Sequence, residues 1–220
     1  MFRWLRLRAR GKNQPLVCPP GTPLHSMRYV VLDTEFTSLD KRSNRLLSVG
    51  AIAMEGTKIR MGEQFYRVLN PGVAVPAPGV VVHQLRPHDV EKGEPPLEAL
   101  EALHHFLAGS VLVGHFVHMD LAVLRKELQG TEQTLVNPVV DTARVHRWIV
   151  RRGRHTEDLF HHLENVDLVS LAKAYRIEFH QAHHALQDAF LTARLWQKLL
   201  CELEADDIRT VDQLLKIASV

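Results

Sequence analysis

The sequence has few cysteines and lacks a long apolar run. Its 220 residues include only Cys18 and Cys201, which lie near opposite ends of the chain and have no metal-ligand spacing. A disulfide framework or a cysteine-ligated zinc site is therefore not expected, and a reducing cytoplasm is the natural compartment. No apolar stretch approaches the ~20 residues that a membrane-spanning helix requires. We expect a cytoplasmic protein without a membrane span.

A strong net charge is also absent. The formal net charge of +2 is too small for bulk electrostatics to indicate a nucleic-acid-binding protein. No acid precedes Asp33, and the same stretch holds six cations, namely Arg3, Arg6, Arg8, Arg10, Lys12 and Arg28. Removing these six from the 27 cations leaves 21, against 25 acids. An acidic main body is consistent with a site lined by carboxylates that needs metal ions to accept an anionic substrate.

The first 26 residues differ in composition from the rest. They begin with a basic segment that lacks the apolar core of a secretory signal. They end in a cluster of structure breakers, namely Pro15, Pro19, Pro20, Gly21 and Pro23. We interpret residues 1–26 as a flexible arm or a docking segment for a partner, with an organelle transit peptide as the alternative. The remainder, in a chain with 45% hydrophobic residues, predicts one domain over 27–204 and a helical extension over 205–220.

The hydrophobic pattern after residue 27 predicts an α/β fold. Short apolar or alternating segments predict strands over 29–33, 46–54, 59–68, 111–113 and 138–141. Apolar residues at helical spacing predict helices from 95 to about 106 and over 118–128, 142–150, 168–175, 184–203 and 211–218, with a mobile loop at 151–164. Three strands joined by short turns, followed by alternating helices and strands, indicate a mixed sheet flanked by helices.

Asp33 and Glu35 lie at the polar end of the first predicted strand. Because residues i and i+2 of a strand face the same side, both carboxylates would project together. Two anions held that close repel each other, so one would retain its proton unless a cation lies between them. The pair therefore indicates either a solvated strand end or part of a metal site.

Two further acids, Asp120 and Asp188, each follow a histidine by five residues, His115 and His183 respectively. Each acid taken alone could simply favour the positive end of its helix. Together with Asp33 they mark strand ends and helix starts, where open α/β sheets collect ligand groups. Five residues span about 140° of an ideal helix. We therefore expect His183 on the loop before the helix that carries Asp188.

These acids predict a site for two divalent metal ions. Ligation by carboxylate oxygens alone favours Mg²⁺ or Mn²⁺ over Zn²⁺, and two such ions support in-line displacement at phosphorus. A histidine, with an unperturbed pKa near 6.5, is suited to accept the proton of the attacking water. Asp141 ends the last predicted strand, where it could equally be an N-cap of the helix that follows.

Three separated motifs, in this order, resemble the DEDDh branch of the DEDD exonuclease superfamily, typified by the proofreading ε subunit of bacterial DNA polymerase III. The motifs are Asp33-Thr34-Glu35, Gly114-His115 with Asp120, and His183 with Asp188-Ala189. The resemblance covers Arg28 to about Leu199 and includes the segments 81–83 and 168–172. It implies a ribonuclease-H-like fold, in which three antiparallel strands precede two parallel ones, and it makes 27–204 an exonuclease domain.

That family removes nucleoside 5′-monophosphates from 3′ ends with two Mg²⁺ or Mn²⁺ ions. By position, the resemblance implies that the metal ligands are Asp33, Glu35, Asp120 and Asp188. It also implies that His183 is the general base and that Asp141 supports the site from behind the sheet. His184 occupies a position where the family often has glycine, and we interpret it as a bystander.

The chain departs from the family pattern beside these motifs. Phe36 and Ser38 replace the usual threonine and glycine, Phe116 replaces a common asparagine, and Met119 replaces a phenylalanine. The loop after Glu35 is expected to present an apolar or stacking surface to the terminal base. The expected substrate contacts are Phe36, Thr37, Leu39, His115 and Phe116. These changes leave open whether the terminal sugar is that of DNA or of RNA.

The resemblance favours a 3′–5′ exonuclease that acts on single-stranded or frayed DNA, in repair or proofreading. An RNA-trimming member of the same superfamily is the nearest alternative, and a non-catalytic polymerase-associated subunit is a more distant one. The expected partners are nucleic-acid 3′ ends and a polymerase, or another replication or repair protein, bound through the N-terminal arm.

Overall fold

The fold is built on a central sheet of five strands. The computed structural model describes residues 19, 21–38, 40, 42–73, 85–131, 133–152, 165–179 and 183–218. The strands are arranged in the order β3-β2-β1-β4-β5. Their bounds are Arg28–Phe36 for β1, Leu46–Glu55 for β2, Lys58–Val68 for β3, Val111–Gly114 for β4 and Val139–Asp141 for β5.

Three strands are antiparallel and the last two are parallel to β1. The β1–β2 and β2–β3 pairs are antiparallel, and β4 and β5 pair in parallel with β1 and β4 respectively. Gly56 adopts a positive φ of 53°, which suits the tight turn that joins β2 to β3. Parallel strands need longer crossovers, and helices supply them here. The predicted ribonuclease-H-like mixed sheet is confirmed.

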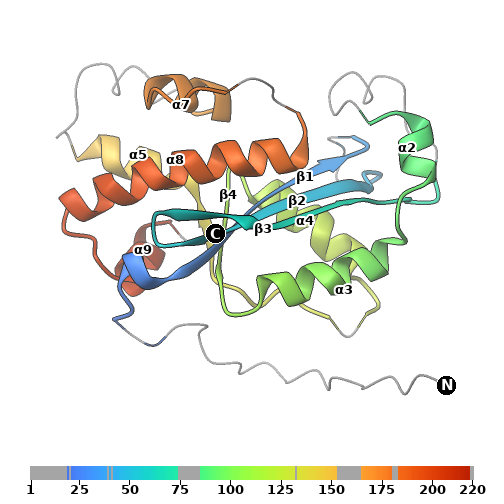
Figure 1. The fold of residues 1–220 in the computed structure, drawn as a ribbon, viewed down its shortest axis with the longest axis horizontal. Helices are drawn as coiled ribbons and strands as arrows, with labels where there is room; N and C mark the ends of the chain where they lie inside the picture. The colour runs from blue at the N-terminus through green and yellow to red at the C-terminus, as the bar shows by residue number, and fades with distance from the viewer. Residues whose placement is uncertain are drawn as a thin grey trace.

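Helices cover both faces of the sheet (Figure 1). The short elements are a 3₁₀ turn η1 at Leu24–Ser26 and α2 at Pro87–Glu91, and neither was predicted. The others are α3 at Pro96–Leu107, α4 at His118–Glu127, α5 at Thr142–Arg151, α7 at Leu168–Ala174, α8 at Ala185–Ala205 and α9 at Val211–Ala218. None of the helices in these described ranges is long and apolar enough to cross a membrane.

The alternation of β1 divides the core into two layers. Val30 and Leu32 pack with α3 and α4 on one face of the sheet. Tyr29 and Val31 pack with α5 and α8 on the other face, where the Tyr29 ring meets Trp196 of α8 edge-on with centroids 5.4 Å apart. Because both faces of the sheet are covered, β1 is almost continuously apolar from Tyr29 to Leu32. Asp33 is the first acidic residue of the strand.

The two ends of the described chain pack together. The Leu24 amide donates to the Arg209 carbonyl at 2.9 Å, and the Val211 amide donates to the Thr22 carbonyl at 2.9 Å. Leu24 is fully buried in the same core that contains Leu214 of α9. Residues 21–26, which precede the expected domain start at 27, therefore pack against the segment that leads into α9, and buried residues of α9 belong to the main core. Residues 1–18 and most of the predicted loop at 151–164 lie outside the described residues.

Candidate metal centre

Three of the predicted acids converge where β1 ends and α8 begins. One ligand atom from each of Asp33, Glu35 and Asp188 lies within 4.8 Å of the other two. Asp33 and Glu35 share one face of β1, as strand alternation predicts. Asp188 is in the first turn of α8, the helix that crosses the same face of the sheet (Figure 1). The three side chains together form a cluster of oxygen ligand atoms.

Gly50 of β2 allows α8 to approach the sheet this closely. Gly50 pairs with Asp33 across the β1–β2 ladder. A Cβ atom added at Gly50 would lie 2.2 Å from the backbone nitrogen of Leu186, which is far inside van der Waals contact. The first turn of α8 therefore rests directly on the backbone of β2, and this contact brings Asp188 to Asp33. Sequence reasoning missed Gly50, because a glycine inside a strand only signals some close backbone approach.

The fourth acid, Asp120, reaches the site from α4 on the opposite face. Its Oδ1 atom accepts a hydrogen bond of 2.6 Å from Thr34 Oγ1. Thr34 points away from its neighbours Asp33 and Glu35, so it can hold Asp120 at the edge of the site. Asp120 is not among the three acids whose ligand atoms converge, but its charge raises the pKa of Asp33.

Burial raises the pKa values of all four carboxyl groups, and repulsion from the other site acids adds to this at Asp33 and Glu35. The pKa of Asp33 lies well above its usual value because of burial and the charges of Asp120, Glu35 and Asp188. Burial, with the charges of Asp188 and Asp120, raises the pKa of Glu35 to about 7. Burial raises the pKa of Asp120 to about 7. Burial also raises the pKa of Asp188. These groups are costly to ionise together without a cation.

The donor set fits divalent metal ions. Asp188 Oδ1 is buried and has no hydrogen-bond partner. Among the ion pairs formed within the described residues, none involves any of the four acids. Clustered carboxylate oxygens without a basic partner are the ligands that Mg²⁺ and Mn²⁺ prefer.

His183 lies on the segment immediately before α8, as its spacing to Asp188 predicts. Its backbone N–H donates to Asp188 Oδ2 at 2.8 Å, and its side chain is exposed. His183 has a φ of 70°, a left-handed conformation that is uncommon for a residue other than glycine. The next residue, His184, is the N-cap of α8. Its ring stacks on that of Tyr66, with centroids 4.6 Å apart.

His115 and Asp141 both form hydrogen-bonding contacts with the first turn of α5. His115 Nδ1 lies 2.8 Å from Thr142 Oγ1, and burial lowers the pKa of the imidazole. Asp141 is the N-cap of α5, and its Oδ1 accepts from the Ala143 amide at 2.9 Å. Its charge also contributes to the raised pKa of Asp120. Asp141 therefore combines the N-cap role with an electrostatic influence on the site.

The expected substrate contacts are distributed around the site. Phe36 is partly buried against the core that contains α3 and α4. Thr37 is buried, and its Oγ1 accepts from the Arg45 amide at 3.0 Å, so this hydroxyl closes the β1–β2 loop. Phe116 has a φ of 51° and its ring lies 4.6 Å from that of His115. Leu39 lies outside the described residues.

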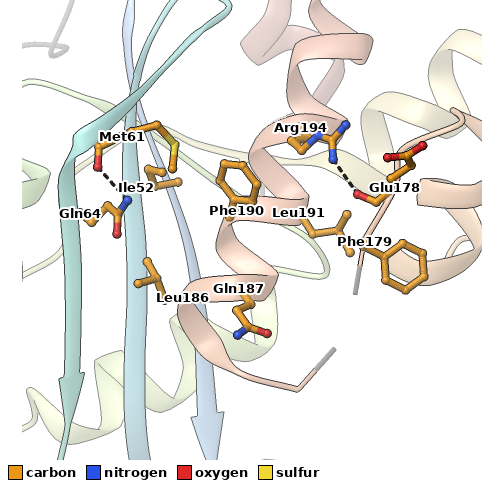
Figure 2. A pocket seen from close by; sticks show the side chains of 10 residues that line it. All are labelled: Ile52, Met61, Gln64, Glu178, Phe179, Leu186, Gln187, Phe190, Leu191 and Arg194. Atoms are coloured by element: carbon orange, nitrogen blue, oxygen red, sulfur yellow. Dashed lines mark hydrogen bonds between the residues drawn. The ribbon is translucent and has the colours of Figure 1, made fainter. Parts of the chain in front are cut away.

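A cavity of about 530 Å³ lies beside the candidate metal centre rather than in it. Residues of α8, β2 and β3 line it. Figure 2 shows Phe190 pointing from α8 toward β2 and β3, with Arg194 bonded to the Glu178 carbonyl further along the helix. None of the four acids lines this cavity. Its mostly apolar wall makes it unsuited to hold cations.

The sequence matches a known family and several curated proteins. A family described as Exonuclease (RNase_T) matches residues 30–196. A PolC-type DNA polymerase III of Clostridium perfringens is 27% identical over 84% of this chain, and an ε-like protein of Rhodobacter capsulatus is 28% identical over 88%. The chain spans 12% and 27% of the lengths of these two proteins. The DNA polymerase III ε subunit of Aquifex aeolicus is 28% identical over 80% of this chain and 81% of its own.

Solved exonuclease structures share the fold. Escherichia coli exonuclease I in complex with a dT13 oligonucleotide superposes with a TM-score of 0.66 and 18% identity, over 82% of this chain and 42% of its own. The nuclease domain of 3′hExo, a DEDDh family member bound to rAMP, has a TM-score of 0.66 and 10% identity, over 81% of this chain and 94% of its own. At these identities the superpositions establish the architecture.

Proposed function

Because the chain belongs to the exonuclease family, with the DEDDh architecture of a 3′–5′ exonuclease domain, we propose that it removes nucleoside 5′-monophosphates from the 3′ ends of single-stranded or frayed DNA. The convergence of Asp33, Glu35 and Asp188 on one small volume carries this proposal. Three acids that are at least half-buried and face one another without an ion pair to a basic side chain have no ordinary structural role.

Four carboxylates would hold two Mg²⁺ or Mn²⁺ ions. Asp33, Glu35 and Asp188 would supply the convergent oxygens, and Asp120, whose carboxylate accepts from Thr34, would be the fourth ligand. When bound, two such ions activate the attacking water and neutralise charge that develops on the phosphate. The Thr34 hydroxyl holds the Asp120 carboxylate at this edge of the site.

His183 would act as the general base. Its exposed ring, just before the N-terminus of α8, can accept a proton from the attacking water and pass it to solvent. The hydrogen bond from its own amide to Asp188 ties the segment that carries the ring to a proposed metal ligand. The base and the metal centre would thus be positioned by one turn of chain.

The test of this mechanism is Asp33→Asn, assayed on a 5′-labelled single-stranded oligonucleotide with Mg²⁺. We expect cleavage to fall by roughly 100-fold or more, because metal ions contribute several kcal/mol to such reactions. Asp207→Asn makes the same chemical change at an exposed acid beyond the far end of α8 and should cleave like the wild type. Undiminished cleavage by Asp33→Asn would refute the assignment, whereas a wild type that only binds the oligonucleotide would support the non-catalytic alternative.

RNA is the second candidate substrate, because a fold neighbour was solved with rAMP. DNA is favoured because the curated relatives above are named as DNA polymerase III proteins or as ε-like proteins. Matched DNA and RNA oligonucleotides of one sequence, digested in parallel, separate the two. Faster loss of the RNA strand would overturn the DNA assignment.

A polymerase or another replication protein is the proposed partner of the basic N-terminal segment. Its alternating arginines and apolar residues over 1–10 suit an acidic, partly apolar surface. A pull-down with the full chain and with a variant lacking residues 1–18 tests this. The deletion stops there because residues 21–26 pair with the C-terminal segment.

A further inference from the structure

The start of α8 lies between the side chains of two residues that are aligned across neighbouring strands of the sheet. Asp33, Gly50 and Tyr66 are paired directly across β1, β2 and β3, so the side chains of Asp33 and Tyr66 point to the same face. Gly50, between them, has no side chain and supports the first turn of α8. Asp188 of that turn lies close to Asp33. His184, which precedes the turn, stacks on Tyr66.

The contact between Tyr66 and His184 is a true ring stack. The ring centroids are 4.6 Å apart and the planes differ by 24°. Both residues are half-buried, and the Nδ1 atom of His184 is buried without a hydrogen-bond partner. The His184 ring is therefore held by stacking on Tyr66 rather than by a polar bond of that atom.

The stack is adjacent to His183, whose backbone has an unfavourable left-handed conformation. His183 has a φ of 70°, whereas His184 is extended with a φ of −139°. A left-handed residue other than glycine is strained and persists only where the surroundings hold it. Among the described residues, two side-chain contacts lie at this turn, namely the bond from the His183 amide to the Asp188 carboxylate and the stack of His184 on Tyr66.

We infer that Tyr66 and His184 are positioning residues, whose stacked rings fix the turn that carries His183 and so set the place of its imidazole beside the carboxylates. This inference rests on the proposed role of His183 as general base. Neither ring is a metal ligand or a proton acceptor in this scheme. The pair acts only through the backbone that it holds.

The first test compares variants that remove the stack with variants that keep it. Tyr66→Leu and His184→Ala remove one ring, whereas Tyr66→Phe and His184→Phe retain two. We expect the first two to lower kcat on a single-stranded oligonucleotide by roughly tenfold with KM within about twofold, because a misplacement near 1 Å can cost up to ~100-fold. The phenylalanine variants should recover most of kcat. Equal losses in Tyr66→Phe and Tyr66→Leu would overturn the inference, because the hydroxyl would then matter rather than the stack.

The second test separates positioning of His183 from a general loss of structure. Tyr66→Leu is combined with His183→Ala, and turnover of the double variant is compared with that of His183→Ala alone. If the stack acts through His183, the second substitution adds little, because residues that work as one unit are non-additive. A further tenfold loss in the double variant would overturn the inference. The Mg²⁺-induced rise in Tm should be the same with and without Tyr66→Leu.

The outcomes also separate this inference from the proposed function. If His183→Ala is as active as the wild type, the proposed base is wrong. If His183→Ala is slow but Tyr66→Leu and His184→Ala match the wild type, only the positioning role is overturned.

Discussion

At the scale of single residues, the candidate site is a set of acids whose ordinary ionisation is opposed by their surroundings. Asp33 and Glu35 are side by side because of strand alternation, and Asp188 and Asp120 reach them from two helices on opposite faces. Burial then raises the pKa of each group. A protein without a cation to bind would gain stability by replacing such groups.

The stability of the metal-free protein should therefore fall as pH rises. The pKa of Glu35 is raised from 4.5 to about 7 in the fold, so the folded state binds this proton more tightly than the unfolded state does. The stability contribution is present below pH ~4.5 and is lost as pH rises through about 7. Thermal melts in EDTA should show Tm falling between pH 5 and pH 8. A Tm that rises over this interval would contradict the shift.

Glu35→Gln should stabilise the metal-free protein at pH 8 and weaken its response to metal. The shift corresponds to an upper bound of about 3 kcal/mol for the carboxylate at that pH. In EDTA the variant should therefore melt several degrees higher than the wild type at pH 8 and at a similar temperature near pH 4.5. With Mg²⁺ the order should reverse, because the wild type gains ligand-binding energy that the amide does not supply.

His183→Ala should lower turnover by roughly 10²–10⁴-fold, the usual contribution of a general base. The residue donates to Asp188 only through its backbone N–H, so the Mg²⁺-induced rise in Tm should largely persist. His88→Ala, at an exposed histidine of α2, is the matched control and should retain full activity. Loss of the metal response in His183→Ala would instead indicate that the imidazole supports the metal centre.

At the scale of elements, the site depends on how closely one helix approaches the sheet. The strands and most helices follow from apolar periodicity, and their predicted positions agree with the observed ones to within a few residues. The distance between α8 and β2 does not follow from periodicity. It depends on Gly50, whose missing side chain makes room for the backbone of Leu186.

Gly50→Ala should damage the site through the backbone alone. The new methyl group would overlap the Leu186 amide and push the first turn of α8 outward, at a cost of about 1–3 kcal/mol. Because Asp188 moves with that turn, we expect exonuclease activity and the Mg²⁺-induced rise in Tm to fall together. Gly62→Ala is the matched control, since nothing lies within 4 Å of the added atom. Normal activity in Gly50→Ala would show that the contact is not needed.

At the scale of the whole molecule, both ends of the described chain complete one core. Residues 21–26 pair with the segment that leads into α9, and Val211, Leu214 and Ala218 of α9 are buried. The predicted extension at 205–220 is thus continuous with the domain. A helix that packs on both α5 and β5 supports the sheet edge on which Asp141 lies.

Leu214→Ala should destabilise the whole domain. Leu214 is fully buried, and truncation of such a leucine costs about 2–5 kcal/mol. Leu215→Ala removes the same atoms from a neighbouring residue that is only partly buried and should cost less than half as much. Urea melts of the two variants check this. Similar midpoints for both variants would indicate that α9 is a detachable extension.

The sequence by itself determined the sheet class and the candidate acids, with their order along the chain. Strand alternation and the spacing of apolar residues are local properties, and the carboxylates of Asp33 and Glu35 had to share a face for that reason alone. The placement of His183 before its helix followed from the angular spacing to Asp188. The direction of a side chain along a strand or a helix depends on residue spacing, which the sequence contains.

Only the tertiary structure decided which distant residues meet. The Thr34 bond to Asp120, the close packing of Leu186 on Gly50 and the stack of Tyr66 on His184 join segments from different elements. The pairing of residues 21–26 with the C-terminal segment is of the same kind. No sequence pattern encodes such contacts, because they depend on how far each element moves as the cores on both faces of the sheet reach close packing.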